Sequence, residues 1–421
     1  MFFDIDEKIL KISEAAEKKS RQAFERVAEI TRYNQQKVLS AFIRNGVSET
    51  HFAESTGYGY GDRGRELIEK IFAECMGAED SIYRHSFNSG THAITVALFG
   101  ILRPGDEMLC VTGRPYDTLI GVLGIDGDVD GSLKQFKIGY NEVGLNDDGQ
   151  PDLPKIAECV KRKFYRVVYI QRSRGYSIRP SLSVDKIGEI TDLVKKISPK
   201  TVVMVDNCYG EFVEKREPCE VGADIIVGSL IKNAGGGIAR TGGYIAGKRE
   251  YVECCANRLT APGIGKEIGA SLGLNRELFL GLFNAPHVTG EALKTAIFSA
   301  ALFSLLGYGV SPEYDEPRHD IIQTLLLKDE QALVCFCRGM QSGSPIDSSA
   351  QPEPWDMPGY DCKVIMAAGA FTLGASIELS ADAPLRSPYA VWMQGGLNFD
   401  SAQIGILLAA QSMYEQKIIR L

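Results

Sequence analysis

One lysine of the chain follows a buried apolar run and precedes three consecutive glycines. Ile225, Ile226 and Val227 predict a strand, and Lys232 comes shortly after its end. Burial lowers the pKa of a lysine amine, and the neutral amine can form a Schiff base with an aldehyde cofactor. The alternative is a surface lysine just past the end of a strand.

A carboxylate ends a second predicted strand, 26 positions before that lysine. The run from Thr201 to Val205 is rich in β-branched residues and ends in Asp206. This separation fits one strand-crossover-strand unit of a parallel sheet, so both side chains would reach the carboxyl edge, where such sheets bind ligands. An aspartate there can keep a pyridinium nitrogen protonated, as pyridoxal 5'-phosphate requires. The alternative is a helix N-cap.

Small hydroxyl residues open a predicted helix after Phe87. Ser89, Gly90 and Thr91 stand before the apolar helical pattern that begins at Ile94. Main-chain N–H groups and the positive end of a helix dipole bind phosphate, and Ser229 could add a hydroxyl. A simple helix cap is the alternative for these residues.

Tyr116 follows the predicted strand 107–112 in a turn that contains Pro115. A ring delivered by the next strand end could stack on a flat cofactor ring. The alternative is an ordinary turn tyrosine.

These signals occur in the order used by pyridoxal phosphate enzymes of the aspartate-aminotransferase fold. The chain resembles the trans-sulfuration group (cystathionine lyases and synthases, methionine γ-lyase), and within it the bacterial branch known as aluminium resistance proteins. The motifs that carry the resemblance span nearly the whole chain and are Gly57-Tyr-Gly-Tyr-Gly-Asp-Arg-Gly-Arg-Glu66, Val205-Asp-Asn-Cys-Tyr-Gly-Glu-Phe212, Ser229-Leu-Ile-Lys-Asn-Ala-Gly-Gly-Gly237 and Tyr389-Ala-Val-Trp-Met-Gln-Gly-Gly396.

The resemblance implies that a tyrosine and an arginine of the first motif reach the cofactor phosphate of a neighbouring subunit. Tyr60 and Arg63 are the candidates, although the group's more familiar Tyr-x-Arg spacing is not reproduced and Tyr58 or Arg65 could serve. A flexible surface loop is the alternative.

Two further arginine positions are candidates for binding a substrate carboxylate. A planar guanidinium can hold a carboxylate with two parallel hydrogen bonds. By resemblance, Arg386 occupies the position of the group's carboxylate-binding arginine. Arg174 follows the predicted strand 166–171, together with Arg172 and Arg179, in a turn more basic than in better-known lyases of the group. These arginines could bind a carboxylate or pair with the phenolic oxygen of the cofactor. Solvated loop arginines are the alternative.

The resemblance also implies fold and reaction. We expect an α/β protein of the type I fold for pyridoxal phosphate enzymes, with a mostly parallel seven-stranded sheet, helices on both faces and a smaller α+β C-terminal domain. Lys232 would bind the cofactor and take the substrate Cα proton, and Tyr116 could protonate the leaving sulfur. The expected activity is carbon–sulfur lyase action, by β- or γ-elimination, on cystathionine or methionine. An aminotransferase and a catalytically silent cofactor-binding protein are the alternatives.

Alternating strand-like and helical patterns set the expected boundaries. Residues 1–65 would form a helical arm and an intersubunit loop, 66–261 the large cofactor-binding domain, and 262–421 the smaller domain. Strands are predicted at 107–112, 135–140, 166–171, 201–206, 224–228 and 243–246. Helices are predicted at 266–283, 289–306 and 400–418.

Composition narrows the expected partners. A net charge of −8 argues against nucleic acid, and no run approaches the roughly 18 apolar residues of a membrane helix. The ten cysteines and five histidines lack zinc-site spacing, so we expect reduced thiols and no metal. Without a signal-peptide pattern or a membrane helix, we expect a cytoplasmic protein. By resemblance, the assembly would be a homo-oligomer with shared active sites, a dimer of dimers.

Overall fold

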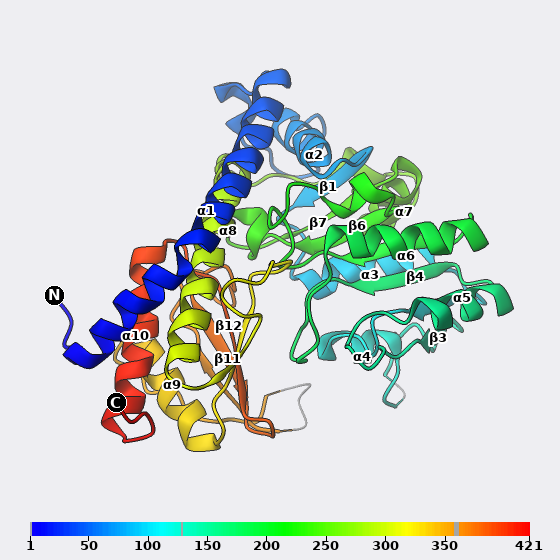
Figure 1. The fold of residues 1–421 in the computed structure, drawn as a ribbon. Helices are drawn as coiled ribbons and strands as arrows, with labels where there is room; N and C mark the ends of the chain where they lie inside the picture. Colours follow the sequence, from blue (N-terminus) through cyan, green and yellow to red (C-terminus); the bar gives the residue numbers. More distant parts are fainter. Residues whose placement is uncertain (1, 128, 358–361) are drawn as a thin grey trace. The chain divides into compact units, whose positions relative to one another are not determined.

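The structure is a computed structural model that describes residues 2–127, 129–357 and 362–421 and consists of two compact units (Figure 1). The large unit is Tyr33–Ala285, and the small unit combines Met1–Arg32 with Pro286–Leu421. The boundary falls within two long helices, α1 (Glu7–Arg44) and α8 (Asn275–Leu305).

The predicted boundaries after residues 65 and 261 both fall inside the large unit. The segments beside them are joined by hydrogen bonds, since Arg65 donates to the carbonyls of Gly59 and Gly269 at 2.8 and 2.7 Å. The main-chain N–H groups of Ser55 and Ser271 each donate to the hydroxyl of the other residue. Contacts that are distant in sequence therefore hold both segments in the unit that contains the sheet.

A seven-stranded sheet forms the centre of the large unit. Its order is β1-β7-β6-β5-β4-β2-β3, and only β7 runs antiparallel to its neighbours. The strands are β1 (Asp80–Arg84), β2 (Glu107–Cys110), β3 (Gly139–Glu142), β4 (Val167–Gln171), β5 (Val202–Asp206), β6 (Ile225–Ser229) and β7 (Gly243–Gly247). The predicted mostly parallel seven-stranded sheet is confirmed.

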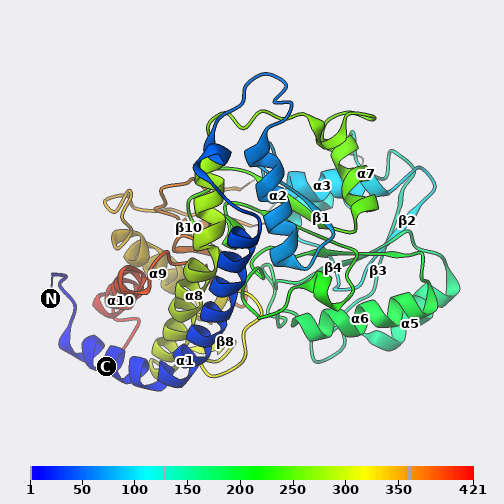
Figure 2. The same ribbon diagram turned by 90° about the horizontal axis from the view of Figure 1, so that it is seen from above.

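Helices cover both faces of this sheet, as Figure 2 shows for α5 and α6 on one side and α3 and α7 on the other. Along β5, Val203 and Val205 join the core beneath α2, α5 and α6, whereas Val202 and Met204 join the core beneath α3, α4 and α7. The helices are α2 (Arg63–Met76), α3 (Gly90–Ile101), α4 (Asp117–Leu123), α5 (Leu153–Arg162), α6 (Val184–Ile197) and α7 (Arg249–Leu259). Burial on both faces explains why the central strands read as continuous apolar runs.

Two predicted elements differ from the structure. The strand predicted at 135–140 begins only at Gly139, because residues 134–137 form turns and Lys137 has a φ of 58°. The helices predicted at 266–283 and 289–306 are one helix, α8, which begins at Asn275 and contains Pro286 in its interior. Gly269 and Gly273 precede it with φ of 123° and 76°, in the region that favours glycine and excludes a helix.

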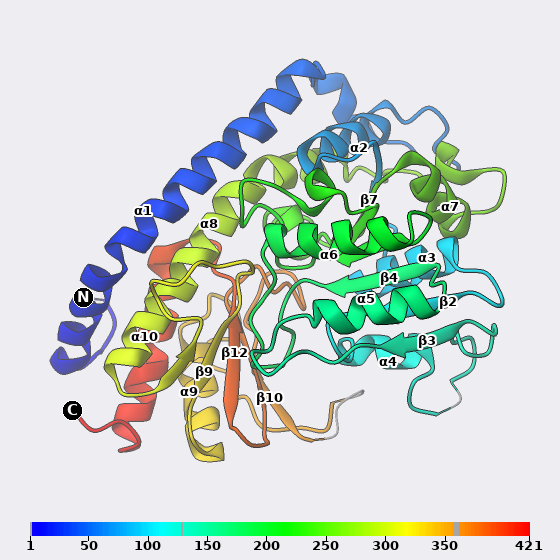
Figure 3. The ribbon, with the colours of Figure 1, turned by 45° about the vertical axis from the view of Figure 1, so that its right-hand side comes forward.

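The small unit contains a five-stranded antiparallel sheet in the order β10-β11-β12-β9-β8 (Figure 3). Its elements are β8 (Gly309–Ser311), β9 (Gln323–Leu326), α9 (Glu330–Ser342), β10 (Val364–Ala367), β11 (Ser380–Pro384), β12 (Ala390–Gln394) and α10 (Phe399–Glu415). Its core joins the sheet to α9 and α10 through residues such as Leu325, Phe336 and Ile406. The predicted smaller α+β region is present.

Helix α8 is the one described helix that is long and apolar enough to cross a membrane. However, 78% of its most apolar window is buried inside the protein, as in a core helix.

Candidate functional site

The carboxyl ends of β5 and β6 bring the principal candidates together. The two strands pair in parallel, with Asp206 opposite Val227. Asp206 is the last residue of β5, and β6 ends two residues after Val227, at Ser229. Lys232 follows Ser229 by three residues and stands at the start of the short 3-10 turn Asn233–Gly235. The sheet edge predicted for Asp206 and Lys232 is therefore where the chain places them.

Lys232 is half-buried against an aromatic ring. Its Nζ lies 3.9 Å from the centroid of the Tyr209 ring, and Tyr209 has a φ of 70°, which is rare outside glycine. The left-handed backbone turns the chain sharply after β5. This turn holds the Tyr209 ring against the Lys232 amine.

The pKa of Lys232 is shifted in the direction opposite to the one that burial alone predicts. Burial lowers it, but the acidic groups around the ammonium raise it by more, so the pKa of Lys232 lies above its usual value. These groups are the side chains of Cys208, Tyr209, Asp206 and Glu211. Burial therefore acts in the predicted direction on the amine, but in the protein without cofactor the neighbouring groups outweigh it.

Asp206 is 8% exposed, and both of its carboxylate oxygens are oriented. Oδ1 accepts from the Cys208 main-chain N–H at 3.1 Å, and Oδ2 accepts from the Tyr169 hydroxyl at 3.3 Å. Tyr169 lies on the adjacent strand β4. The carboxylate is thus fixed by its own turn and by a neighbouring strand.

The turn before α3 approaches the same edge. The Ser89 hydroxyl caps α3 by accepting from the His92 main-chain N–H at 3.0 Å. A Cβ added at Gly90 would lie 3.3 Å from the Ser229 Cβ and 3.5 Å from the Cys208 Sγ. Ser89, Gly90 and Ser229 are therefore neighbours, and a side chain at position 90 would crowd the turn.

Thr91 and Tyr116 come close to this turn through other partners. The Thr91 hydroxyl is 2.8 Å from that of Thr118, near the start of α4. Tyr116 precedes that helix, and its N–H donates to the Gln171 Oε1 at 2.8 Å. Because Gln171 pairs with Asp206 across β4 and β5, this bond ties Tyr116 to the same edge. Its ring lies 5.7 Å from that of Tyr176.

The three arginines after β4 are buried rather than solvated. Arg172 donates to the Asn207 Oδ1 at 2.7 Å and to Glu214 at 2.8 Å, and Arg179 donates to the carbonyls of Gln171 and Ser173. These two therefore hold the turns after β4 and β5. Arg174 is 2% exposed, and its role in binding a carboxylate stays a prediction.

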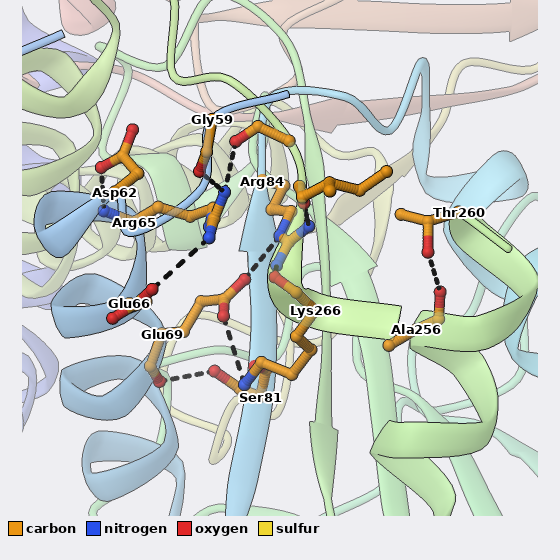
Figure 4. A network of polar contacts seen from close by, with 12 residues as sticks. Gly59, Asp62, Arg65, Glu66, Glu69, Ser81, Arg84, Ala256, Thr260 and Lys266 are labelled. Carbon is orange, nitrogen blue, oxygen red and sulfur yellow. Dashed lines mark hydrogen bonds and ion pairs between the residues drawn. The ribbon is translucent and has the colours of Figure 1, made fainter. Parts of the chain in front are cut away.

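The two candidate arginines lie in the first turn of α2, directly after the glycine-rich loop, and Figure 4 shows the surroundings of Arg65. Arg65 is buried and spends its guanidinium on main-chain carbonyls, including those of Gly59 and Gly269. Arg63 is exposed, and Tyr60 is 66% exposed, as is Tyr58 beside it at 72%. Of the two arginines, Arg63 is the one presented outward.

Arg386 lies in the small unit, on the exposed turn between β11 and β12. Its proposed role with a substrate carboxylate stays a prediction.

With this geometry in place, comparison with known proteins identifies the family. Residues 9–414 match the methionine gamma-lyase family. The chain belongs to that family.

Two relatives are similar to this methionine gamma-lyase family member over nearly its whole length, and a third over about half of it. The uncharacterized protein YnbB of Bacillus subtilis is 48% identical over 394 residues, which are 93% of either chain. A solved carbon-sulfur lyase involved in aluminum resistance from Clostridium novyi NT is 49% identical, with a TM-score of 0.94 over 97% of this chain and 96% of that one. A cystathionine gamma-synthase of Mycobacterium leprae is 27% identical over about half of each chain, 51% and 49%. The resemblance and the fold type drawn from the sequence are confirmed.

Three residues near Lys232 in this family member were not among the site residues predicted from the sequence. Cys208, Tyr209 and Glu211 all lie in the motif that begins at Val205, within five positions of Asp206. Cys208 is 5% exposed and Glu211 is fully buried. Their closeness in sequence to Asp206 was the available signal, but only the turn after β5 shows that they surround the lysine.

The family depends on pyridoxal phosphate, and the residues present fit that group. The start of α3 supplies main-chain N–H groups beside the hydroxyls of Ser89 and Ser229, and a side chain at Gly90 would crowd Ser229. A fixed carboxylate at Asp206 and an amine at Lys232 stand on the same edge. Among the residues that the structure describes, no cluster of His, Cys, Asp or Glu is arranged to hold a metal ion.

Proposed function

We propose that this protein is a pyridoxal phosphate-dependent carbon–sulfur lyase that acts on a sulfur amino acid such as cystathionine or methionine. The observation that carries the proposal is the convergence of Lys232, Asp206 and the Ser89–Ser229 turn on one sheet edge of a methionine gamma-lyase family member. The closely similar carbon–sulfur lyase of Clostridium novyi supports the reaction class.

When bound, pyridoxal phosphate supplies an electron sink for the electron pair left at the substrate Cα. The hydroxyls of Ser89, Thr91 and Ser229 and the N–H groups near Gly90 would bind its phosphate. Asp206 would hold a proton on the ring nitrogen, because a carboxylate in contact stabilises the charged pyridinium.

Lys232 would hold the aldehyde carbon through its amine, and the substrate amine would take its place there. The amine of Lys232, free again, could then accept the Cα proton as general base. Tyr116 would lie on the ring and give a proton to the leaving sulfur. Arg386 and Arg174 would bind the substrate carboxylate, which orients the Cα–H bond.

We further propose that two subunits share each site and assemble as a dimer of dimers in the cytoplasm. The support is the outward presentation of Tyr60 and Arg63, whose side chains could reach the phosphate bound by the partner. Size measurement in solution, with and without Arg63→Glu, tests the assembly.

The decisive experiment joins cofactor attachment to turnover. The purified protein, loaded with pyridoxal phosphate and reduced with borohydride, should carry the added mass on the peptide that contains Lys232. Lys232→Ala should lose both that mass and the near-visible absorbance band. Lys248→Ala is the matched control, since Lys248 also follows a strand but pairs with Asp224 at 2.7 Å.

Products then identify the reaction. Cystathionine should release pyruvate by β-elimination or 2-oxobutyrate by γ-elimination, each with a thiol. Amino transfer to a 2-oxo acid without thiol release would instead establish an aminotransferase. Cofactor attachment with no product from either amino acid would establish a silent binding protein.

A further inference from the structure

Glu211 is a buried carboxyl beside the lysine that the proposed mechanism does not use. It is fully buried, and its Oε1 accepts from the Tyr244 hydroxyl at 2.7 Å. Its main-chain carbonyl accepts from the Asn233 Nδ2 at 3.0 Å, next to Lys232. Its Oε2 is also buried and has no hydrogen-bond partner among the described residues. A carboxyl with one oxygen held and the other unpaired is costly to bury, so a role for it is expected.

The packing keeps the phenol against this carboxyl. Tyr244 on β7 pairs with Gly228 on β6, and a Cβ at Gly228 would lie 2.5 Å from the Tyr244 Cε1. Glycine at position 228 therefore gives the ring its space directly below the strand that leads to Lys232. Tyr244 itself is fully buried.

Titratable groups from two strands and two strand ends act on Glu211. They are Tyr83 of β1, Tyr244 of β7, Lys232 after β6, and Cys208 and Glu217 of the segment after β5. Burial raises the pKa of Glu211 and the nearby Glu217 adds to this, whereas the Tyr244 hydrogen bond, the main-chain N–H of Glu211 and Lys232 lower it. The resulting pKa is about 8. Glu211 is in turn one of the acidic groups that raise the pKa of Lys232.

We propose that Glu211 is a positioning residue that sets the charge of Lys232. Ionised Glu211 holds the lysine as an ammonium group, and protonated Glu211 allows the amine to lose its proton and react. Tyr244 tunes the exchange by favouring the ionised carboxylate. The inference rests on the proposed function, because it assumes that the reactive group of the site is the amine of Lys232.

The test measures the reactivity of each lysine in the full-length chain without cofactor. Trace acetylation with acetic anhydride across a pH series, quantified by mass spectrometry, compares Lys232 with the other lysines of the same molecule. Glu211→Gln should make Lys232 about tenfold more reactive at alkaline pH, as loss of a nearby negative charge lowers a lysine pKa. Tyr244→Phe should shift the reactivity in the same direction by less, because Glu211 then stays protonated to a higher pH.

Glu217→Gln is the matched control. Glu217 is also fully buried, but its oxygens are held by the Phe212 N–H and the Asn207 side chain. This variant should not increase the reactivity of Lys232. Equal reactivity of Lys232 in the wild type, Glu211→Gln and Tyr244→Phe would overturn the proposal. The labelling needs no cofactor, so failure of the chain to bind pyridoxal phosphate would leave this result readable on its own.

Discussion

Two buried groups of charged side chains in the large unit differ in how their charges are matched. In the first, Glu69 lies between two cations, with its Oε1 2.7 Å from the Arg84 Nε and its Oε2 3.2 Å from the Lys266 Nζ (Figure 4). Lys266 is also 2.6 Å from Asp80. We call this set the Glu69 network. Positive and negative groups alternate in it, and the remaining donors of Arg84 reach main-chain carbonyls.

The second group surrounds Lys232 and is dominated by acids. A single ammonium is near Asp206, Cys208, Tyr209 and Glu211, and the pKa values of Lys232 and of Glu211 both lie above their usual values. We call this set the Lys232 cluster. Where buried charges of opposite sign are paired, removal of one partner destabilises the fold. Where one sign predominates, the pKa values of the groups are shifted, as is typical of catalytic sites. The difference predicts that mutations in the cluster affect chemistry and mutations in the network affect stability.

The largest effect is expected from Asp206→Asn in the Lys232 cluster. The amide keeps the shape and can still accept from the Cys208 N–H, but it cannot hold a proton on a ring nitrogen. Turnover of the sulfur amino acid should fall about 10³-fold, while the unfolding temperature changes little. Assays of 2-oxo acid release and thermal melts measure the two. A variant that unfolds early yet turns over normally would reverse the assignment of this cluster.

Glu69→Gln should show the opposite pattern. Removing one charge from a buried pair leaves Arg84 and Lys266 without their shared carboxylate, which costs about 3 kcal/mol of unfolding free energy. Denaturant unfolding measures this loss, and turnover by the folded fraction should persist. Glu66→Gln is the control, because the Glu66 side chain is 55% exposed and its pairing with Arg65 should contribute under about 1 kcal/mol.

Arg63→Ala tests the exposed first residue of α2, which follows the glycine-rich loop. If Arg63 reaches the phosphate bound by the partner subunit, retention of pyridoxal phosphate should weaken about tenfold. The unfolding temperature of the cofactor-free chain should not change, since the side chain is exposed. Arg65→Ala should instead lower that temperature. Unaltered cofactor retention in Arg63→Ala would remove this residue from the site.

The smallest effect concerns Asp62, the N-cap of α2. Burial alone would raise its pKa, but hydrogen bonds from the Arg65 N–H, Ser271, Ser55 and Asn275 together lower the pKa to about 2. Its contribution is therefore complete above the unfolded-state pKa of about 3.9 and is lost as the pH falls towards 2.

Asp62→Asn keeps the cap but removes the charge. The variant should be about 1 kcal/mol less stable than the wild type at pH 6, after allowing for solvent screening, and the gap should fall to about half at pH 3. Denaturant unfolding at the two pH values measures it. A gap that is the same at both values would mean that the charge of Asp62 is not the cause.

Much of the fold was predictable because it rests on local patterns. Apolar runs marked β4, β5 and β6 within one or two residues, since strands buried on both faces need side chains that are apolar throughout. The run at 135–140 failed because a turn residue with positive φ at Lys137 looks like an ordinary polar position in the sequence. The single helix α8 was missed because its packing tolerates Pro286 in the interior.

Sequence alone determined the order of Ser89, Tyr116, Asp206 and Lys232 along the chain, and through parallel topology the edge that they share. Tertiary structure alone decided the electrostatic state of that edge. The turn after β5 places Cys208, Tyr209 and Glu211 around the lysine, and β7 brings the Tyr244 hydroxyl to Glu211. The physical reason is that a pKa depends on the charges and the solvent within a few ångströms, and distance in space is not written in the spacing of residues.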